Sequence, residues 1–452
     1  MSAAISVGKF VNFLTNLQGG GGTAAPGLYA LKIDPNLVEK LSGKIKNGAI
    51  VIAGTNGKTT TARITTDILA TEYQTIHNRQ GSNLLRGVAS TLITSISIVG
   101  NIKSDLAIWE ADEAALPEIV KQTKPKTIVL LNLFRDQLDR YGEVETIREK
   151  WSEAISTLPA ETKLILNADD PSVAFIAKSF KGKPVYFGVE EKKIDLPIIE
   201  NVADVRFCLN CGAPLKYDPI FSAHLGHWSC PKCHYDRPKP SISATNARFK
   251  PDLSTHLGLS IANRQSTVDY KLPGLYNVYN VLAAAATAKL LGIDDKQIIK
   301  AIEDFQAAFG RFQKMDIKGK KAVVFLIKNP AGANEVIRTI SPLKNVSLLT
   351  ILNDNIADGR DVSWIWDTNW EVLKGKFKSI NTSGTRAYDI ALRLKYADMN
   401  NISVHEDINT SFQESLDKLG TKDTLLILPT YTAMLELQGI LKKYGGATWH
   451  KQ

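Results

Sequence analysis

The segment that most constrains this chain is a short apolar run, residues 49–52, followed directly by Ala53-Gly-Thr-Asn-Gly-Lys-Thr-Thr-Thr61. A strand that leads into a loop with two glycines, a lysine and several threonines is typical of a phosphate-binding loop. The glycines let the backbone turn tightly and direct N–H groups at phosphate oxygens. The segment therefore predicts a strand–loop–helix unit that binds a nucleoside triphosphate.

Different residues of this loop are expected to contact the phosphates and the Mg²⁺ ion. Lys58 supplies a positive charge at the β- and γ-phosphates, and Thr59 places a hydroxyl on Mg²⁺. A helix expected over 62–70 directs its positive N-terminus at the same anion. The gap between the two glycines is shorter than in the common pattern, which restricts the families of phosphate-binding loop that fit. The predicted nucleotide-binding residues of the loop are Gly54, Thr55, Asn56, Gly57, Lys58, Thr59 and Thr60.

The overall composition indicates a soluble globular protein. A length of 452 residues predicts two or three domains, and no apolar run is long enough for a transmembrane helix. The first residues lack a convincing cleavage site, so we expect a cytoplasmic protein, with the inner face of the membrane as an alternative location. The net charge of +9 fits attraction to phosphate ligands, or to an anionic membrane surface or nucleic acid. No Lys/Arg cluster is interleaved with aromatics, so nucleic acid is not an expected partner.

All four cysteines of the chain fall in a Cys-x2-Cys…Cys-x2-Cys arrangement that matches a tetrathiolate zinc site. The alternatives are two disulfides or a redox pair, but nothing in the sequence indicates export. Four thiolates close the coordination shell, so the site is expected to be structural. The predicted zinc ligands are Cys208, Cys211, Cys230 and Cys233.

Strand and helix signals alternate from residue 48 onward, which predicts an α/β fold. Residues 1–47 are interpreted as an N-terminal segment and 48–310 as a central nucleotide-binding domain. The cysteine-rich part, about 206–238, is interpreted as a zinc ribbon inserted in that domain. Residues 311–452 are expected to form a smaller, open, Rossmann-like α/β domain.

A second group of candidate residues follows the strand expected at 105–109. Carboxylates at the carboxyl end of a strand beside a phosphate loop are placed to hold Mg²⁺, directly or through water. Glu110 is the preferred ligand because it stands at the end of the strand. An ordinary acidic helix N-terminus is the alternative for Asp112 or Glu113.

Four ordered motifs resemble those of the Mur ligase family. The first is the loop. The second is a segment that begins with an asparagine after an apolar strand and continues to Asp-Gln-Leu-Asp, Tyr and Gly. The others are a Leu-Pro-Gly segment that leads into an Ala-rich helix and a Phe-Gly-Arg-Phe segment at the expected domain junction. Their residues are Gly54–Thr60, Leu131–Gly142, Leu272–Asn280 and Phe309–Phe312.

The resemblance implies an ATP-dependent ligase that activates a carboxylate as an acyl phosphate. It also implies roles for individual residues of this chain. Asn277 and Arg311 would contact the nucleotide. Lys58, Thr59 and Glu110 would hold the phosphates and Mg²⁺, with Glu110 counted among the catalytic residues.

The chain departs from the general family pattern in four ways. Gln137 stands where most Mur ligases carry a metal-binding histidine, and an amide is a weaker ligand than imidazole. The 47 residues before the loop cannot form a domain that binds a nucleotide sugar. A zinc ribbon is inserted, and Lys328-Asn-Pro-Ala-Gly332 replaces a segment that usually carries an acidic residue.

These departures, together with the run from Asp354 to Asp367, resemble the MurT family within the Mur ligases. MurT proteins are the synthetase subunits of lipid II isoglutaminyl synthase. The resemblance implies ATP-dependent amidation of the α-carboxyl of D-glutamate in the lipid II stem peptide, giving D-isoglutamine. It also implies a heterodimer with a GatD-like glutaminase that supplies ammonia. ATP, Mg²⁺ and Zn²⁺ are the expected cofactors.

The acidic run 354–367 permits two interpretations. It can be a turn with Asp caps and a Trp-anchored helix. By resemblance, one of its acids would orient the catalytic histidine of the glutaminase, since a carboxylate behind a histidine fixes its tautomer. Asp361 is the first choice and Asp358 the second.

Two further segments carry weaker signals. Thr382-Ser-Gly-Thr-Arg386 fits either a ligand cleft or a strand-to-helix turn. Lys150 stands where some Mur ligases carry a carbamylated lysine, but its charged neighbours favour a solvated helix face.

Two competing functions remain. A ligase similar to folylpolyglutamate synthase would add an amino acid rather than ammonia, and the zinc ribbon and the 354–367 run count against it. A nucleic-acid-binding zinc-ribbon protein that uses ATP as a switch is disfavoured by the weak clustering of basic residues.

Overall fold

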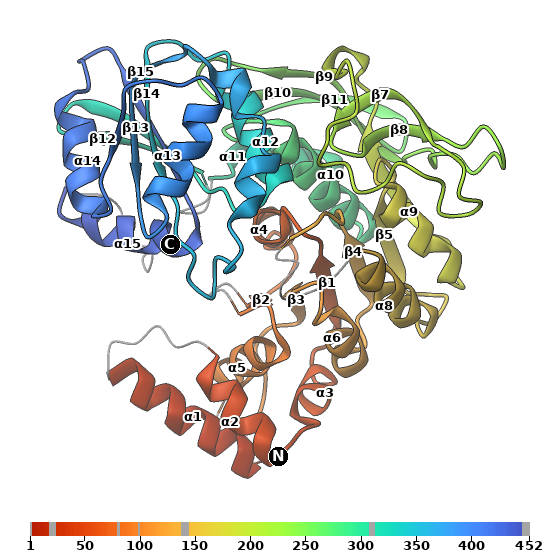
Figure 1. Cartoon of the computed structure of the whole chain (residues 1–452). Coiled ribbons are helices and arrows are strands. Elements are labelled where there is room, and N and C mark those ends of the chain that lie inside the picture. Colours follow the sequence, from red (N-terminus) through yellow and green to blue (C-terminus); the bar gives the residue numbers. More distant parts are fainter. Residues whose placement is uncertain are drawn as a thin grey trace.

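The computed structural model describes residues 2–17, 24–78, 82–97, 100–136, 144–306 and 312–444. In these ranges the chain forms a nine-stranded sheet, a six-stranded sheet and a separate two-stranded sheet. Figure 1 shows the two large sheets in separate parts of the molecule, with the C-terminal part in blue beside the green and orange central part. The expected α/β fold is confirmed.

The nine-stranded sheet has the order β11-β10-β9-β6-β5-β4-β1-β3-β2. Along this order the strands from β2 to β9 are parallel, whereas β10 is antiparallel to both of its neighbours, β9 and β11. Every residue of β1 is buried, as is usual where helices cover both faces of a parallel sheet. The strands are β1 (Ala49–Ala53), β2 (Thr75–His77), β3 (Leu106–Ala111), β4 (Thr127–Leu130), β5 (Lys163–Asn167), β6 (Val185–Val189), β9 (Ile242–Phe249), β10 (Thr255–Ile261) and β11 (Arg264–Tyr270).

Alternate residues of β1 enter two hydrophobic cores, one on each face of the sheet. Ile50 and Ile52 pack in the core that contains α4 and α10, whereas Val51 packs in the core that contains α5, α6 and α8. This alternation follows from the twofold period of a strand. The helices of this part are α4 (Lys58–Leu69), α5 (Leu85–Ser95), α6 (Leu116–Thr123), α8 (Val144–Ser156), α9 (Pro171–Ile176), α10 (Leu275–Leu290) and α11 (Asp295–Asp304), with short 3-10 helices η1 (Ala177–Ser179) and η2 (Lys192–Ile194).

Three helices precede β1: α1 (Ser2–Leu17), α2 (Ala25–Ile33) and α3 (Leu37–Ser42). Helices α1 and α2 pack on each other and on α5, and α3 packs on α5 and α6. They form the lower lobe of the molecule in Figure 1. The N-terminal segment is therefore an added helical layer on one face of the large sheet.

The cysteine-rich segment lies between β6 and β9, which are neighbours in the large sheet. Its hairpin consists of β7 (Lys216–Ser222) and β8 (Leu225–Ser229). The side chain of Phe221 packs in the central core, and the indole Nε1 of Trp228 donates a hydrogen bond to the carbonyl of Ala168 at 3.0 Å. The ribbon is thus an insertion that is anchored to the sheet from which it emerges.

The six-stranded sheet has the order β12-β13-β17-β14-β15-β16 and is parallel except for β12. Helices cover both of its faces. Its elements are β12 (Phe312–Ile317), β13 (Lys320–Phe325), α12 (Pro330–Ile340), β14 (Val346–Ile351), η3 (Ser363–Asp367), η4 (Trp370–Leu373), β15 (Phe377–Ser383), α13 (Ala387–Tyr396), β16 (Ile402–Val404), α14 (Ile408–Asp417), β17 (Thr424–Pro429) and α15 (Tyr431–Lys442).

The helix after the phosphate loop begins earlier than the sequence suggests. It starts at Lys58, not at residue 62, and Gly57 precedes it with a φ of 90°. Threonines have low helix propensity, but here the loop's tight turn and packing against α10 impose the helix. Lys58 and Thr59 consequently stand in the first helical turn, where the free N–H groups are.

A buried carboxylate joins the two parts of the molecule. Glu200, in the segment before the ribbon, accepts a hydrogen bond from Arg338 Nη1 on α12 at 2.7 Å and from Asn369 Nδ2 at 3.0 Å. Its other oxygen accepts from the backbone N–H of Ala223 in the ribbon, at 2.7 Å. One side chain therefore connects the ribbon, α12 and the loop after η3.

Replacing Glu200 with alanine removes four side-chain acceptor contacts, one of them from Asn334, and leaves Glu335 as the ion-pair partner of Arg338. We expect the free energy of unfolding in urea to fall by about 2 kcal/mol. The control is Glu39→Ala, which removes an exposed ion pair with Lys124 and is expected to cost less than about 1 kcal/mol. Equal losses in the two variants would contradict the bridging role of Glu200.

Candidate active site and candidate metal centre

The two glycines of the phosphate loop are required by close contacts. A Cβ atom on Gly57 would lie 2.1 Å from the side-chain oxygen of Asn280, and a Cβ atom on Gly54 would lie 2.7 Å from the Cβ of Leu131. Both glycines also have positive φ values. The loop therefore fits tightly between the end of β4 and helix α10.

The residues after β4 hold the loop in place. The backbone N–H of Asn56 donates to Asn132 Oδ1 at 2.8 Å, and the N–H of Phe134 donates to Thr55 Oγ1 at 3.0 Å. The first residues of the motif Leu131–Gly142 thus hold the phosphate loop directly. The loop is preorganised because its polar groups already have partners.

Two lysines and two acids form a charge cluster at this end of the sheet, in which Lys58 and both carboxylates are buried and Lys328 is partly exposed. Lys58 Nζ lies 3.0 Å from Glu113 Oε2, and Lys328, from the C-terminal part, pairs with Asp136. Burial raises the pKa of Glu113, but the charges of Lys58 and Lys328 outweigh it, and the net pKa is lowered. Burial raises the pKa of Asp136, and the nearby Glu113 adds to that rise. The cluster brings positive charge from both parts of the chain to one place.

Glu110 lies at the end of β3 within reach of the loop. Thr59 Oγ1 donates to Glu110 Oε2 at 2.7 Å, and His77 Nε2 lies 3.0 Å from Glu110 Oε1. The side-chain amide of Asn78 also bonds to the backbone of Glu110 at both its N–H and its carbonyl. A hydroxyl and a carboxylate are the hard oxygen ligands that Mg²⁺ prefers. The pair Thr59 and Glu110 therefore fits a magnesium ion.

The structure places Asn277 beside the loop, on α10. Its Nδ2 donates to the carbonyl of Pro273 at 2.7 Å, and its Oδ1 accepts from Asn280 Nδ2 at 3.0 Å. Asn280 also accepts a hydrogen bond from Thr61 on the helix of the loop. The predicted residues Arg311 and Gln137 lie outside the described residues.

A pocket of about 120 Å³ lies at the junction of the two parts. Its lining includes the loop residues Asn56, Gly57 and Thr60 on one side, and Lys328 and Gly332 on the other. The side-chain amide of Asn56, which lines the pocket, bonds to that of Asn329 from the C-terminal part. Ligand pockets are usually several times larger. The two parts thus stand close together at this pocket.

A larger hollow of about 1130 Å³ lies at the opposite edge of the sheet. Its lining includes Asn47, Lys126 and Lys163, each of which stands at or before the start of a strand. Ligands of open parallel sheets bind beyond the carboxyl ends of the strands, so this hollow is not the nucleotide site. Lys150 is exposed on α8 and lines the same hollow.

The two predicted acids of the 354–367 run have different surroundings. Asp358 is buried and accepts from the backbone N–H of Thr432 at 2.7 Å, and burial raises its pKa. Asp361 is exposed, and a hydrogen bond from the N–H of Ser363 to its Oδ1 lowers its pKa. Asp358 therefore fixes the loop, whereas Asp361 presents an ionised carboxylate at the surface.

The segment Thr382–Arg386 supports the same loop. Thr385 Oγ1 donates to Asp354 at 2.9 Å, and Arg386 pairs with Asp354 and with Asp389. None of these residues lines the pocket at the domain junction. The segment therefore forms a strand-to-helix turn that holds the start of the acidic run.

Large apolar side chains are exposed beside this loop. Three of them lie on one side of α13, at successive turns, and the fourth is on η3, with its ring centroid 5.4 Å from that of Tyr396. Exposed apolar patches on a folded protein mark interaction sites. We name this group the C-terminal apolar surface; it consists of Trp366, Tyr388, Leu392 and Tyr396.

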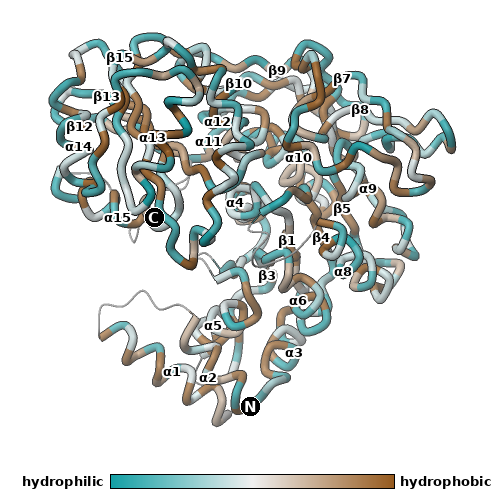
Figure 2. Tube along the Cα trace, in the orientation of Figure 1, coloured by the Kyte–Doolittle hydropathy of each residue, from teal (hydrophilic) through white to brown (hydrophobic). Residues whose placement is uncertain are grey.

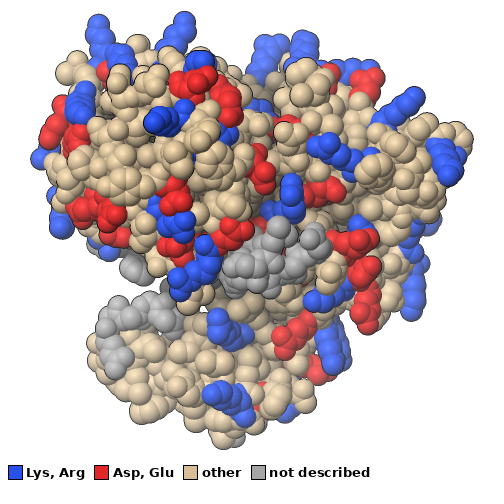
Figure 3. All heavy atoms as spheres, viewed as in Figure 1, with Lys and Arg blue, Asp and Glu red and all other residues tan. Residues whose placement is uncertain are grey.

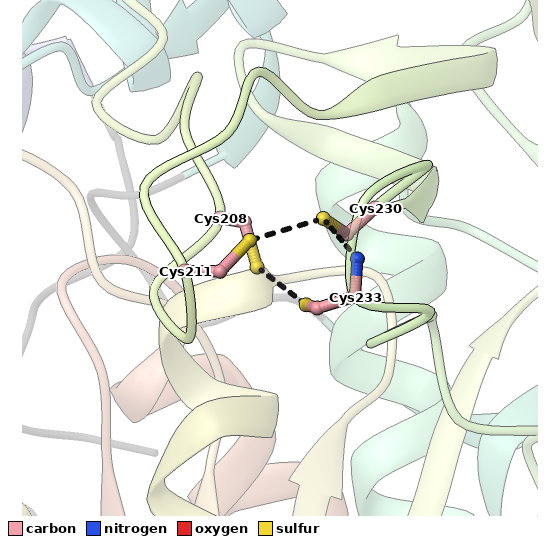
Figure 4. A group of neighbouring side chains, drawn as sticks. All are labelled: Cys208, Cys211, Cys230 and Cys233. Carbon is pink, nitrogen blue, oxygen red and sulfur yellow. Dashed lines mark hydrogen bonds between the residues drawn. The ribbon is translucent and has the colours of Figure 1, made fainter.

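The four cysteines come together as the sequence predicts. Figure 4 shows their side chains pointing toward one another from two turns, and all four sulfur atoms lie within 4.8 Å of one another. The Sγ–Sγ distances are 3.6 Å for Cys208 and Cys233 and 3.5 Å for Cys211 and Cys230. Disulfide sulfurs lie about 2.05 Å apart, whereas thiolates around one tetrahedral zinc lie about 3.8 Å apart. The geometry fits a metal and excludes disulfides.

Several residues of the site were missed by the sequence reasoning. His77 stands at the end of β2, beside the end of β3, so a strand assignment at 75–77 would have indicated it. Asp136 and Lys328 belong to motifs that were noticed without these roles. The contacts of Glu113 and Asn280 depend on long-range packing, and the sequence carries no local signal for them.

Comparisons with known proteins agree with this arrangement. Residues 52–210 match the Mur ligase middle domain, and residues 326–434 match the MurT ligase C-terminal family. Among solved structures, a pseudomurein peptide ligase type C from Methanothermus fervidus has a TM-score of 0.68 at 24% identity, covering 89% of this chain and 80% of that one. MurF ligase from Thermotoga maritima, in complex with ADP, has a TM-score of 0.66 at 14% identity, covering 92% of this chain and 83% of that one. The fold is that of the Mur ligases.

Two relatives indicate which family within the Mur ligases the chain belongs to. The chain is 34% identical over 435 residues to the lipid II isoglutaminyl synthase (glutamine-hydrolyzing) subunit MurT of Staphylococcus aureus (strain COL), covering 95% of each chain. It is 33% identical over 440 residues to the subunit of the same name of Streptococcus pneumoniae (strain ATCC BAA-255 / R6), covering 96% of this chain and 95% of that one. The chain belongs to the MurT family, and the resemblance found in the sequence is confirmed.

Among the described residues, no helix combines the length and the apolar composition that crossing a bilayer requires.

The cysteine cluster predicts about one zinc ion per chain. Cys230→Ser should lower the zinc content measured by atomic absorption, and chelation of the native chain should lower its melting temperature. The control is His234→Asn, because His234 is exposed and lies next to the cluster. Loss of zinc in this control would contradict a four-cysteine site, and zinc-free native protein would contradict a metal centre.

The contact between Gly57 and Asn280 predicts a strong effect of Gly57→Ala. The added Cβ would collide with Asn280 and strain a residue with a φ of 90°, so we expect at least a tenfold loss of ATP affinity by calorimetry. Gly292→Ala is the control, because Gly292 has a φ of 89° with open space around it. It should cost about 1 kcal/mol of stability without changing ATP affinity. Equal ATP affinities in the two variants would contradict the role of the contact.

Proposed function

We propose that this chain is the synthetase subunit of an amidotransferase that converts the α-carboxyl of D-glutamate in the lipid II stem peptide to the amide of D-isoglutamine. The observation that carries the proposal is that the phosphate loop and Lys328 line one pocket, while Glu110 bonds to Thr59 of the same loop. The two curated relatives bear the name of the lipid II isoglutaminyl synthase subunit and are covered over nearly their whole length. ATP is the nucleotide that this chemistry requires.

In this proposal the loop from Gly54 to Thr60 binds the phosphates of ATP. Lys58 leaves Glu113 for the β- and γ-phosphates, and Thr59 and Glu110 hold Mg²⁺. When bound, the ion supplies positive charge that neutralises the phosphoryl group. Asn277 and Arg311 contact the rest of the nucleotide.

The reaction has two steps. A carboxylate oxygen of the acceptor attacks the γ-phosphorus of ATP, the bond to the bridging oxygen breaks, and ADP and an acyl phosphate form. Ammonia then attacks the acyl carbon, phosphate leaves, and the nitrogen loses a proton to give the amide. Lys58, from the phosphate loop, and Lys328, from the C-terminal part, stabilise the charge on the transferred group. Closure around the acyl phosphate protects it from water.

The ammonia comes from a partner. All four cysteines of the chain belong to the proposed zinc cluster, which leaves none as a glutaminase nucleophile. We propose that a GatD-like glutaminase docks on the C-terminal apolar surface to form a heterodimer. The exposed Asp361 then orients the catalytic histidine of the partner, and the buried Asp358 keeps the loop in shape.

The organisation of the chain follows from these roles. We propose that residues 1–47 form an N-terminal segment, 48–310 the ATP-binding domain with a structural zinc ribbon at about 206–238, and 311–452 the domain that meets the partner. Because the acceptor is carried by a lipid, the enzyme works at the cytoplasmic face of the membrane.

Reconstitution with the partner tests the function. The chain, a GatD-like glutaminase, ATP, Mg²⁺, glutamine and lipid II are combined, and the stem peptide is analysed by mass spectrometry. We expect an amidated product and one ADP for each amide. Absence of the amide would contradict the proposal, and ATP turnover that depends on free glutamate would favour a ligase similar to folylpolyglutamate synthase.

The variant Asp361→Asn tests whether the residue acts in ammonia production by the partner and not in amide formation by this chain. The variant should lose at least about a hundredfold of its glutamine-dependent amidation, because a neutral amide cannot stabilise the imidazolium of the partner. Amidation with added ammonium salt should persist, and so should binding of the partner. Asp367→Asn, at the exposed end of η3 in the same acidic run, is the control and should change neither rate. Full glutamine-dependent activity of Asp361→Asn would refute the role.

The C-terminal apolar surface predicts a second variant. Tyr388→Ala combined with Tyr396→Ala removes two exposed rings from one side of α13, and we expect the affinity for the glutaminase to fall at least a hundredfold. Calorimetric titration measures it. The control is Phe249→Ala, an exposed ring on β9. An unchanged affinity in the tyrosine variant would show that the partner docks elsewhere.

A further inference from the structure

Helix α1 is oriented unlike an ordinary surface helix. Its small residues face the protein: Ala4 is buried, and a Cβ atom on Gly8 would lie 2.8 Å from the side chain of Ile93. Its large apolar residues face solvent, with Phe10 61% exposed and Leu17 68% exposed. A surface helix normally buries its large apolar side chains. The exposed apolar side chains on the outer face of α1 therefore indicate that this face binds an apolar partner or surface.

Helix α2 lies against α1 and adds to this surface. Figure 2 shows hydrophobic positions along both helices, and on the face drawn in Figure 3 most of the surface at these helices carries no Lys, Arg, Asp or Glu. In Figure 1 the two helices lie well away from α13, which carries the C-terminal apolar surface. We name this second group the N-terminal apolar surface; it consists of Phe10, Phe13, Leu14, Leu17, Leu28, Tyr29 and Ile33.

The charges of this segment are all positive. The first 33 residues of the sequence contain Lys9 and Lys32 but no Asp or Glu. Lys32 is exposed, and its Nζ lies 5.6 Å from the centre of the Tyr29 ring. Lysines beside exposed aromatic and aliphatic side chains are typical of helices that lie in the interface of an anionic membrane.

We propose that the N-terminal apolar surface binds peripherally to a lipid bilayer with anionic headgroups. Phe10, Phe13 and Leu17 enter the boundary between headgroups and acyl chains, and Lys32 meets the headgroup charge. Helix α1 has 16 residues, which is too short to span a bilayer, so it lies on the surface. The choice of a membrane rests in part on the proposed function, since a lipid-linked acceptor lies in that plane. The glutaminase has its own surface at α13.

Vesicle co-sedimentation of the full chain tests this inference. Vesicles of phosphatidylcholine with or without phosphatidylglycerol are used, and none contains lipid II, so binding is measured independently of catalysis. The native chain should bind the anionic vesicles more strongly. Phe10→Ser combined with Phe13→Ser should lower the partition coefficient at least tenfold on both. Lys32→Glu should lower it about fivefold or more on anionic vesicles only.

Ile198→Ser is the matched control, because Ile198 is 73% exposed and lies far along the chain, before the ribbon. It should leave vesicle binding unchanged. The phenylalanine variant should retain native amidation of a water-soluble muropeptide, which shows that it is folded and that the active site is intact.

Vesicle binding that is equal in the native chain and the phenylalanine variant would overturn the inference, as would no binding by the native chain. A concentration-dependent dimer that this variant abolishes, without vesicle binding, would assign the surface to a second copy instead. Failure of amidation in every preparation, with vesicle binding intact, would contradict the proposed function but support the membrane surface.

Discussion

The charge cluster at the domain junction is the interaction on which the arrangement of the site depends. Lys58 of the phosphate loop pairs with Glu113, and Lys328 of the C-terminal part pairs with Asp136. Buried charges are costly unless they are paired, so the two parts close against each other with their charges balanced. A triphosphate offers both lysines a stronger partner. The cluster thus explains how an enzyme of this kind can stay closed when empty and reorganise when ATP enters.

Hydrogen bonds also connect the segment that follows the acidic run to the nucleotide-binding part. Asn369, just after η3, donates its backbone N–H to Asn334 on α12 at 2.8 Å and its side-chain amide to Glu200. Glu200 in turn bonds to the ribbon at Ala223. Asn369 therefore links α12 and Glu200 to the segment that follows Asp361 and η3. This linkage offers a physical route by which ATP binding and glutamine hydrolysis can be coordinated.

Much of the fold was predictable because its signals are local. The run 49–61 indicated a strand and a phosphate loop, and the spacing of the four cysteines indicated a cluster, since each depends on a few consecutive residues. The start of α4 was mispredicted because packing against α10 overrides the low helix propensity of threonine. Strands such as β2 and β9 were missed because they are short or irregular and gain their stability from neighbours distant in sequence.

The residues of the site also fall into those with a local sequence signal and those that depend on long-range packing. Lys58, Thr59 and Glu110 were predicted from their positions at the ends of strands and loops. The partners that orient them were not, because His77, Glu113 and Asn280 meet the loop only through the assembled sheet and α10. Asp358 and Asp361 were predicted as a pair, and only their different burial separates the residue that holds the loop from the one that faces solvent.

The central claim is that the chain activates a carboxylate by phosphorylation. The most direct measurement uses an acceptor whose α-carboxylate is labelled with heavy oxygen, and follows the label during amidation. An acyl phosphate intermediate transfers one carboxylate oxygen to phosphate, so the account predicts heavy inorganic phosphate in an amount equal to the amide formed. Unlabelled phosphate in the presence of the amide would contradict the account, because the carboxylate oxygen would then have left without being phosphorylated.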